Sequence, residues 1–156
     1  AAFNDGKNLD ARHDMLLGAF YGGMCIATSS TTAVHALAYP LGGKYRIAHG
    51  ISNAILLPYV MQFNAVGNEA KFRDIAEAMG IDIARLSDAE ATQAFIAALF
   101  AFNHDLEIPA DLKRWNITEA DLETLVEGAA KVTRLLDNNP RPMNKDDIRA
   151  VYLKLL

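Results

Sequence analysis

Apolar residues recur at intervals of three and four along most of this chain, the spacing that lines one face of an α-helix. The first such segment runs from Leu9 to about Ile26, and either Asn8 or Asp10 can cap its N-terminus. Its apolar face is made of Met15, Leu16, Ala19, Phe20, Gly23 and Met24. The pattern therefore predicts one amphipathic helix at the start of the chain.

A second helix is predicted from Thr31 to about Leu41. Ser29 and Ser30 precede it and are residues that favour a helix N-cap. Pro40 lacks a backbone N–H and clashes with the preceding turn, so we expect it to kink or end this helix. The pair Gly42-Gly43 follows and is expected to complete the stop as a turn.

The third predicted helix begins near His49 and is apolar on nearly every side, which indicates a central position. Pro58 removes the hydrogen bond that the Ala54 carbonyl would otherwise accept, so a bend is expected there. Four further helices are predicted, at Asn68–Met79 before Gly80, from Ser87 with Glu90 to Asp105, from Thr118 with Asp121 to about Leu135, and after Asn144. No segment alternates as a strand does. We therefore predict an all-α helical bundle forming a single domain over residues 1–156.

Composition narrows the class of protein. Half of the 156 residues are hydrophobic (51%), and the net charge is −4, with no basic cluster. Phosphate binding needs a basic face, so nucleic acid is not expected as a partner. No apolar run approaches the ~18 residues that a membrane span needs. Cys25 is the only cysteine, which excludes an internal disulfide and fits a cytoplasmic location.

Candidate chemistry is concentrated between Val34 and Val60. His35 and Tyr39 are four positions apart and so share one face of the second helix, and His49 opens the third. If the intervening turn folds these helices side by side, both imidazoles can reach one ion, and neutral imidazole suits Fe, Zn, Ni or Cu. The alternative is that both histidines are core residues.

Two imidazoles do not complete a metal site, since catalytic metals have three or four protein ligands. His13 and His104 are weak candidates, because the first lies among charged residues and the second closes a helix. The chain has no HExxH, dinucleotide-binding, P-loop or GxSxG motif, and we assign it no cofactor-binding residue of its own. As a self-contained enzyme the chain looks incomplete.

The segment VHALAYPLGGKYRIAHGISNAILLPYVMQFN resembles the signature of the iron-dependent (group III) alcohol dehydrogenases. That signature has a His, a second His four residues on, Pro-Leu-Gly, and a third His within His-Gly-x-x-Asn-Ala-x-x-Leu-Pro. The KFRDIAEAMG and NPRPMNKDDI segments match later parts of the family in order, so the resemblance covers essentially the whole chain.

The resemblance implies a two-domain, homo-oligomeric (dimeric) enzyme that interconverts a small alcohol and its aldehyde or ketone. Its N-terminal domain, absent from this chain, binds NAD(P), and its all-helical C-terminal domain holds Fe(II), with Zn possible. The usual ligands are an Asp and three His. His35 and His49 match the last two, and the other two are expected upstream of Ala1. The isolated chain is therefore expected to be inactive.

One position departs from the signature. Tyr39 replaces the family's middle His, which is not a ligand and is commonly assigned to proton relay. The resemblance thus makes Tyr39 the candidate catalytic residue, although tyrosine has a reference pKa near 10, against about 6.5 for histidine. Two alternatives stay open. One is a non-catalytic helical packing domain, and the other is a relative that works without metal, such as a maleylacetate reductase.

Overall fold

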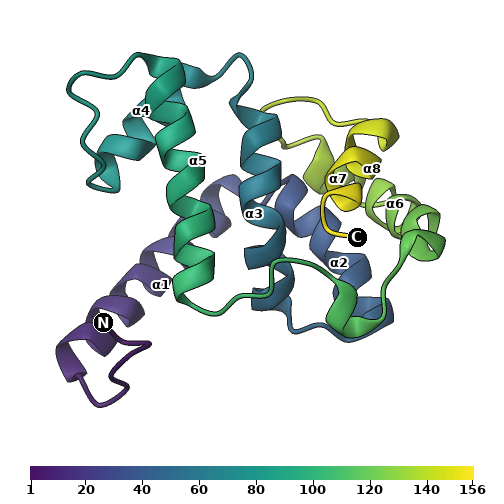
Figure 1. The fold of residues 1–156 in the computed structure, drawn as a ribbon, viewed down its shortest axis with the longest axis horizontal. Coiled ribbons are helices and arrows are strands. Elements are labelled where there is room, and N and C mark those ends of the chain that lie inside the picture. The colour runs from purple at the N-terminus through teal and green to yellow at the C-terminus, as the bar shows by residue number, and fades with distance from the viewer. The chain divides into compact units, whose positions relative to one another are not determined.

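The computed structural model describes residues 1–156, and its contacts divide the chain into two units, Ala1–Thr31 and Thr32–Leu156. The regular structure consists of eight α-helices and two short 3-10 helices, without strands (Figure 1). The prediction of an all-α fold is confirmed. None of these helices is both long enough and apolar enough to cross a membrane.

The first unit contains one helix, α1 (Leu9–Ser29). Asn8 is its N-cap, because the Asn8 side chain accepts a hydrogen bond from the Ala11 N–H at 3.0 Å. No residue of α1 is buried, and its large apolar side chains are exposed. They are Leu9, Met15, Leu16, Leu17, Phe20, Tyr21, Met24 and Ile26. The first unit therefore contains no core that buries the apolar side chains of α1.

The second unit begins with α2 (Ala33–Tyr45), and here the predicted boundaries were wrong. The N-cap is Thr32 rather than a serine, and the helix continues through Pro40 and the Gly-Gly pair. It ends at Arg46, whose left-handed backbone (φ 56°) lets the Arg46 N–H reach the last turn. Interior proline costs about 3 kcal/mol. Burial of the apolar face that includes Leu37 and Leu41 offsets that cost.

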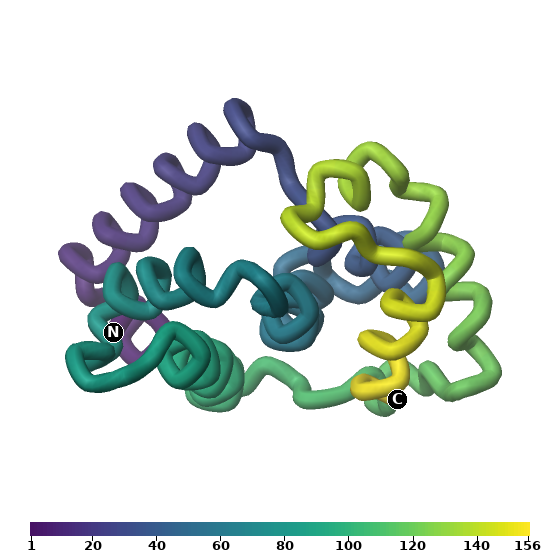
Figure 2. The backbone as a smooth tube through the Cα atoms, turned by 90° about the horizontal axis from the view of Figure 1, so that it is seen from above, coloured from purple at the N-terminus to yellow at the C-terminus, as the bar shows by residue number.

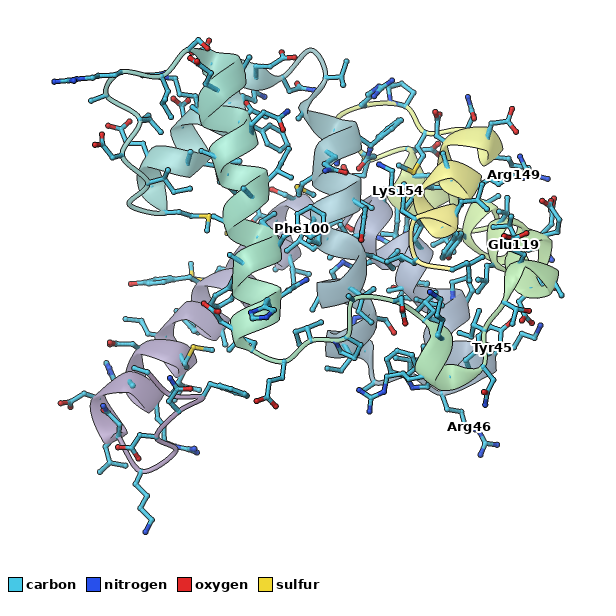
Figure 3. All side chains as sticks on the ribbon, viewed as in Figure 1. Tyr45, Arg46, Phe100, Glu119, Arg149 and Lys154 are labelled. Atoms are coloured by element: carbon cyan, nitrogen blue, oxygen red, sulfur yellow. The ribbon has the colours of Figure 1, made fainter.

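The next helix, α3 (His49–Ala65), begins where the sequence predicts and runs through Pro58. The Ala54 carbonyl, left without its usual partner, accepts a hydrogen bond from the Asn103 side-chain amide at 2.7 Å. Asn103 belongs to α5 (Asp88–Asp105), so this hydrogen bond ties α5 to the proline-containing part of α3. Beside it, the ring of Phe100, which is labelled in Figure 3, meets the ring of Tyr59 edge to face, with centroids 5.1 Å apart.

The helices α4 (Glu69–Ala78) and α5 (Asp88–Asp105) pack on each other around a small apolar cluster that includes Phe72 and Phe95. The predicted capping box of Ser87 and Glu90 opens α5. Within the second unit, α4 and α5 lie on one side of α3, and α2 lies on the other with the C-terminal helices (Figures 1 and 2). The prediction that α3 is central is confirmed for this unit.

The C-terminal part consists of η1 (Lys113–Trp115), η2 (Glu119–Asp121), α6 (Leu122–Ala130), α7 (Thr133–Leu136) and α8 (Lys145–Leu153). The prediction of one helix to Leu135 was wrong, because the chain breaks at Val132 and turns Leu135 into the core against α2. Asn144 caps α8 as predicted. From α8, the buried Tyr152 hydroxyl donates to the Leu37 carbonyl at 2.7 Å.

Asn103→Leu should lower the free energy of unfolding by about 1–3 kcal/mol, because it leaves the Ala54 carbonyl without a donor. Pro58→Ala supplies a backbone N–H for the same carbonyl. The loss from Asn103→Leu should therefore be smaller in a Pro58→Ala background, which a double-mutant cycle of urea unfolding measures. An equal loss in both backgrounds would show that the Asn103 amide does not substitute for the missing bond.

Candidate metal centre

Two adjoining helices supply the residues that the sequence singles out. His35 lies in the first turn of α2, and Tyr39 follows one turn later on the same face. His49 is the first residue of α3, and only Arg46, Ile47 and Ala48 separate the two helices. Ile47 is buried, with 3% of its surface exposed, and so anchors this short connection in the core. The chain therefore reverses within three residues, and α3 returns along α2.

This reversal brings the two histidines together. The His35 and His49 ring centroids are 5.2 Å apart, and the ring planes are inclined at 57°. With metal–nitrogen distances of about 2 Å, two imidazoles bound to one ion have centroids about 5 Å apart. The separation and the chemistry of both side chains therefore fit a shared ion of the kind that imidazole binds.

The two imidazoles differ in their surroundings. His35 is half-buried and His49 is exposed. Burial lowers the pKa of His35 below its usual value, and the neighbouring His49 lowers it further because two imidazolium charges repel. A neutral imidazole is the form that binds metal, so both effects favour the ligand form of His35.

Tyr39 stands beside this pair and faces outward. Its ring centroid is 6.2 Å from that of His49, and its side chain is 45% exposed. A phenol at this place can donate a hydrogen bond to a molecule that approaches the histidines from solvent. The structure thus gathers all three residues that the sequence singles out, His35, Tyr39 and His49.

Asn53 is a fourth member of the cluster, and the sequence analysis did not single it out. It lies one turn after His49 in α3, and its amide nitrogen is 3.0 Å from His49 Nε2 and 2.9 Å from the His49 carbonyl oxygen. Its own oxygen, Oδ1, is buried without a hydrogen-bond partner. Leaving a buried acceptor unpaired costs about 1–3 kcal/mol. The available signal was the Asn of the His-Gly-x-x-Asn-Ala part of the signature, which lies four positions after His49.

Two buried amides hold the frame of the site. Asn64 near the end of α3 and Asn139 in the loop before α8 exchange two hydrogen bonds, of 3.1 and 2.6 Å. Asn139 Oδ1 also accepts from the N–H of Ala33, the first residue of α2, at 3.4 Å. The pair therefore links both histidine-bearing helices. No local sequence signal indicates it, because the two asparagines are separated by 75 positions.

The other histidines do not join the pair. His13 and His104 are exposed, and each lies near the aspartate that follows it, at 3.6 and 3.5 Å. No group of three or more His, Cys, Asp or Glu side chains that could hold a metal forms in this chain. A cavity of about 110 Å³ beside Tyr59 and Phe100 is lined by neither His35 nor His49. The structure thus brings two potential metal ligands together without a third.

Comparison with known proteins gives one family, described as the Fe-containing alcohol dehydrogenase family, C-terminal, which matches residues 1–156. The chain is 40% identical over 151 residues to long-chain-alcohol dehydrogenase 1 of Geobacillus thermodenitrificans (strain NG80-2), covering 97% of this chain and 38% of that protein. The chain is 38% identical over 143 residues to lactaldehyde reductase of Escherichia coli (strain K12). That match covers 92% of this chain and 37% of that protein.

The fold has matches among solved structures. The crystal structure of a 1,3-propanediol oxidoreductase superposes with a TM-score of 0.92 at 37% identity, covering 97% of this chain and 39% of that one. An alcohol dehydrogenase from Oenococcus oeni gives a TM-score of 0.93 at 31% identity, covering 99% of this chain and 40% of that one. The chain therefore spans about two fifths of the length of these relatives, and the resemblance inferred from its sequence is confirmed.

Proposed function

This chain belongs to the Fe-containing alcohol dehydrogenase family, and from that premise we propose that it is the metal-binding C-terminal domain of a longer NAD(P)-linked alcohol dehydrogenase. The observation that carries the proposal is the approach of His35 and His49, whose ring centroids are 5.2 Å apart. The remaining ligands, an Asp and a His, would come from outside these 156 residues. Their absence accounts for a site that holds two ligands and no third.

Fe(II), or Zn(II) in its place, would supply Lewis-acid polarisation of an alcohol or carbonyl oxygen, and NAD(P) would carry the hydride. His35 and His49 would hold the ion from one side. Burial lowers the pKa of His35, which favours the neutral imidazole that a metal ion needs. The contribution of this chain would thus be a pair of imidazole donors on two packed helices.

Tyr39 would orient the substrate. Its hydroxyl can donate a hydrogen bond to the reacting oxygen or accept one from it, and its ring lies beside His49. Tyrosine is a weaker base near neutrality than histidine, because its reference pKa is near 10. Proton transfer would therefore run through water or through another group, with Tyr39 as the hydrogen-bonding residue.

The partner expected for this domain is the nucleotide-binding part of the same longer protein. The exposed apolar residues of α1 support this, because a 21-residue helix with no buried residue is unusual unless something covers it. The relatives extend well beyond the matched region, since only 37–38% of their length is covered. A homo-oligomeric assembly and a cytoplasmic location remain predictions.

The substrate class is an alcohol and its aldehyde or ketone. The names of the relatives refer to long-chain alcohols, lactaldehyde and 1,3-propanediol. These compounds share a carbon–oxygen group that gains or loses a hydride, but they differ in chain length and polarity. The proposed substrate class is therefore defined by the carbon–oxygen group that gains or loses the hydride.

His49→Ala in the full-length protein should reduce bound iron or zinc to a trace, since losing a ligand costs more than the roughly 10–100-fold in affinity that an outer partner contributes. His35→Ala should do the same. Metal content measured by elemental analysis checks this, with the exposed His13→Ala as matched control. Unchanged metal content in both ligand variants would favour a non-catalytic packing domain or a metal-free reductase.

Tyr39→His should change the pH dependence of kcat in the full-length enzyme. A histidine introduces a group that titrates near neutrality, so a new inflection is expected between about pH 6 and 7. Steady-state rates measured across this range for both proteins would show it. Superimposable profiles would remove any proton-related role for position 39.

The purified 156-residue chain should show no NAD(P)-dependent oxidation of alcohols, because it lacks the cofactor site and half of the ligands. Absorbance at 340 nm in the presence of excess Fe(II) or Zn(II) measures this, with the full-length protein as positive control. NAD(P)-dependent turnover by the isolated chain would contradict the proposal that another domain supplies the cofactor site and half of the metal ligands.

A further inference from the structure

We propose that an apolar groove along α1 is filled by the segment of chain directly upstream of Ala1, folded as an α-helix that runs antiparallel to α1. The inference rests on one part of the proposed function, namely that these 156 residues belong to a longer protein. It adds which segment of that protein covers α1, and in which direction the segment runs. All the residues that support it belong to the first unit, Ala1–Thr31.

The groove follows one stripe of α1. Two adjoining hollows share His13 and Leu16, and together they extend from Leu9 to Phe20. These residues and Leu17 follow the spacing of a single helix face, as the contact stripe of a packed helix does. Leu16 is 72% exposed and Phe20 is 62% exposed. A row of large apolar side chains this exposed indicates a surface that another element covers.

The groove begins at the N-terminus of the chain. Ala2 lines the first hollow together with Leu9 and Leu16. Both views of the backbone show the N-terminus beside the first turns of α1 (Figures 1 and 2). The chain that precedes Ala1 therefore meets the groove at one end, and Phe20 marks the other end.

The first residues of the chain have the hydrogen bonds of a last helical turn. The Asp5 N–H donates to the Ala1 carbonyl at 3.0 Å, which is the i to i−4 bond of an α-helix. The Asn4 N–H donates to the same carbonyl at 3.0 Å, and such i to i−3 bonds are frequent where a helix ends. These bonds indicate that Ala1–Asp5 is the end of a helix whose earlier turns lie upstream.

The connection between that turn and α1 is short enough to set the direction of the upstream helix. Only Gly6, Lys7 and Asn8 separate Asp5 from Leu9, the first residue of α1. The Lys7 N–H donates to Asp5 Oδ1 at 2.9 Å, and the Asn8 N–H donates to the Asp5 carbonyl at 3.1 Å, so the connection is a closed turn. Helices joined by about two to five residues pack as an antiparallel hairpin. The upstream helix therefore returns along α1.

The upstream segment is favoured over a second copy of the chain as the occupant of the groove. The matching family model is described as C-terminal, and the match covers 38% of the Geobacillus relative, so most of the remaining length of that relative precedes the matched region. A segment attached at Ala1 is also held at the groove at a high effective concentration, whereas a second copy has to bind from solution.

Disulfide crosslinking in the full-length protein tests the position of the upstream helix. Counted from Lys7, the middle of the connection, the antiparallel neighbour of Phe20 should lie about seven residues before Ala1. Phe20→Cys is combined, one at a time, with a cysteine at each position from about four to ten residues before Ala1. A disulfide needs Cα atoms within about 7 Å, so crosslinks should form at only one or two positions, a helical turn apart. Peptide mapping of the non-reduced protein identifies them.

Asp14→Cys is the matched control. Asp14 lies in the same helix, its side chain is 82% exposed, and it points about 120° away from Phe20 around the helix axis. Combined with the same upstream cysteines, it should give no crosslink. Hydrogen exchange of the unmodified full-length protein is a second measurement that needs no variant. The α1 amides should be protected there to the same degree as those of α3.

Crosslinks that form within one molecule, at helical spacing and only with Phe20→Cys, would support the proposal. Crosslinks between two molecules, detected by mixing isotope-labelled and unlabelled protein, would show that a second copy covers the groove and would overturn it. Equal crosslinking of Phe20→Cys and Asp14→Cys, no crosslink with either, or unprotected α1 amides would also overturn it. Bound iron or zinc in the same proteins is measured separately, so the proposed metal function stands or fails independently of this result.

Discussion

The candidate site depends on the packing of α2 along α3. The contact is almost wholly apolar, formed by fully buried residues such as Leu37 and Leu41 on one helix and Leu56 on the other. Burial of such side chains contributes about 1.5–3 kcal/mol each. This packing, together with the three-residue reversal between the helices, places histidines fourteen positions apart side by side. The imidazoles themselves add little to the stability of the arrangement, since His49 is exposed.

Both histidine-bearing helices contain an interior proline, and a neighbouring helix packs close to each one. At Pro58, Asn103 of α5 donates to the carbonyl that the proline leaves unpaired. At Pro40, α6 approaches so closely that a Cβ at Gly128 would lie 2.9 Å from Pro40 Cγ. Only glycine permits that approach without movement. The two prolines are therefore places where neighbouring helices pack against the histidine-bearing helices.

The surroundings of His35 favour its neutral form. Two imidazolium groups this close would repel, and burial disfavours charge on His35, so both effects lower the pKa of His35. A neutral His35 offers a lone pair without a positive charge of its own. Asn53 adds a donor at His49, and the Asn64–Asn139 pair holds the helices from the opposite end of α3. Hydrogen bonds thus orient the polar side chains, and apolar packing brings the two helices close together.

The sequence by itself determined the helical class, the caps at Asn8, Ser87 and Asn144, the start of α3, and the three residues that meet at the site. These follow from local periodicity, from short-range hydrogen bonding, and from a signature long enough to recognise. The tertiary structure decided the rest. Helix α2 runs past Pro40 because its buried face outweighs a local penalty, and the chain breaks at Val132 because Leu135 packs into the core. The hydrogen bonds of three asparagines join residues far apart in the sequence, so no local pattern indicates them. These residues are Asn64, Asn103 and Asn139.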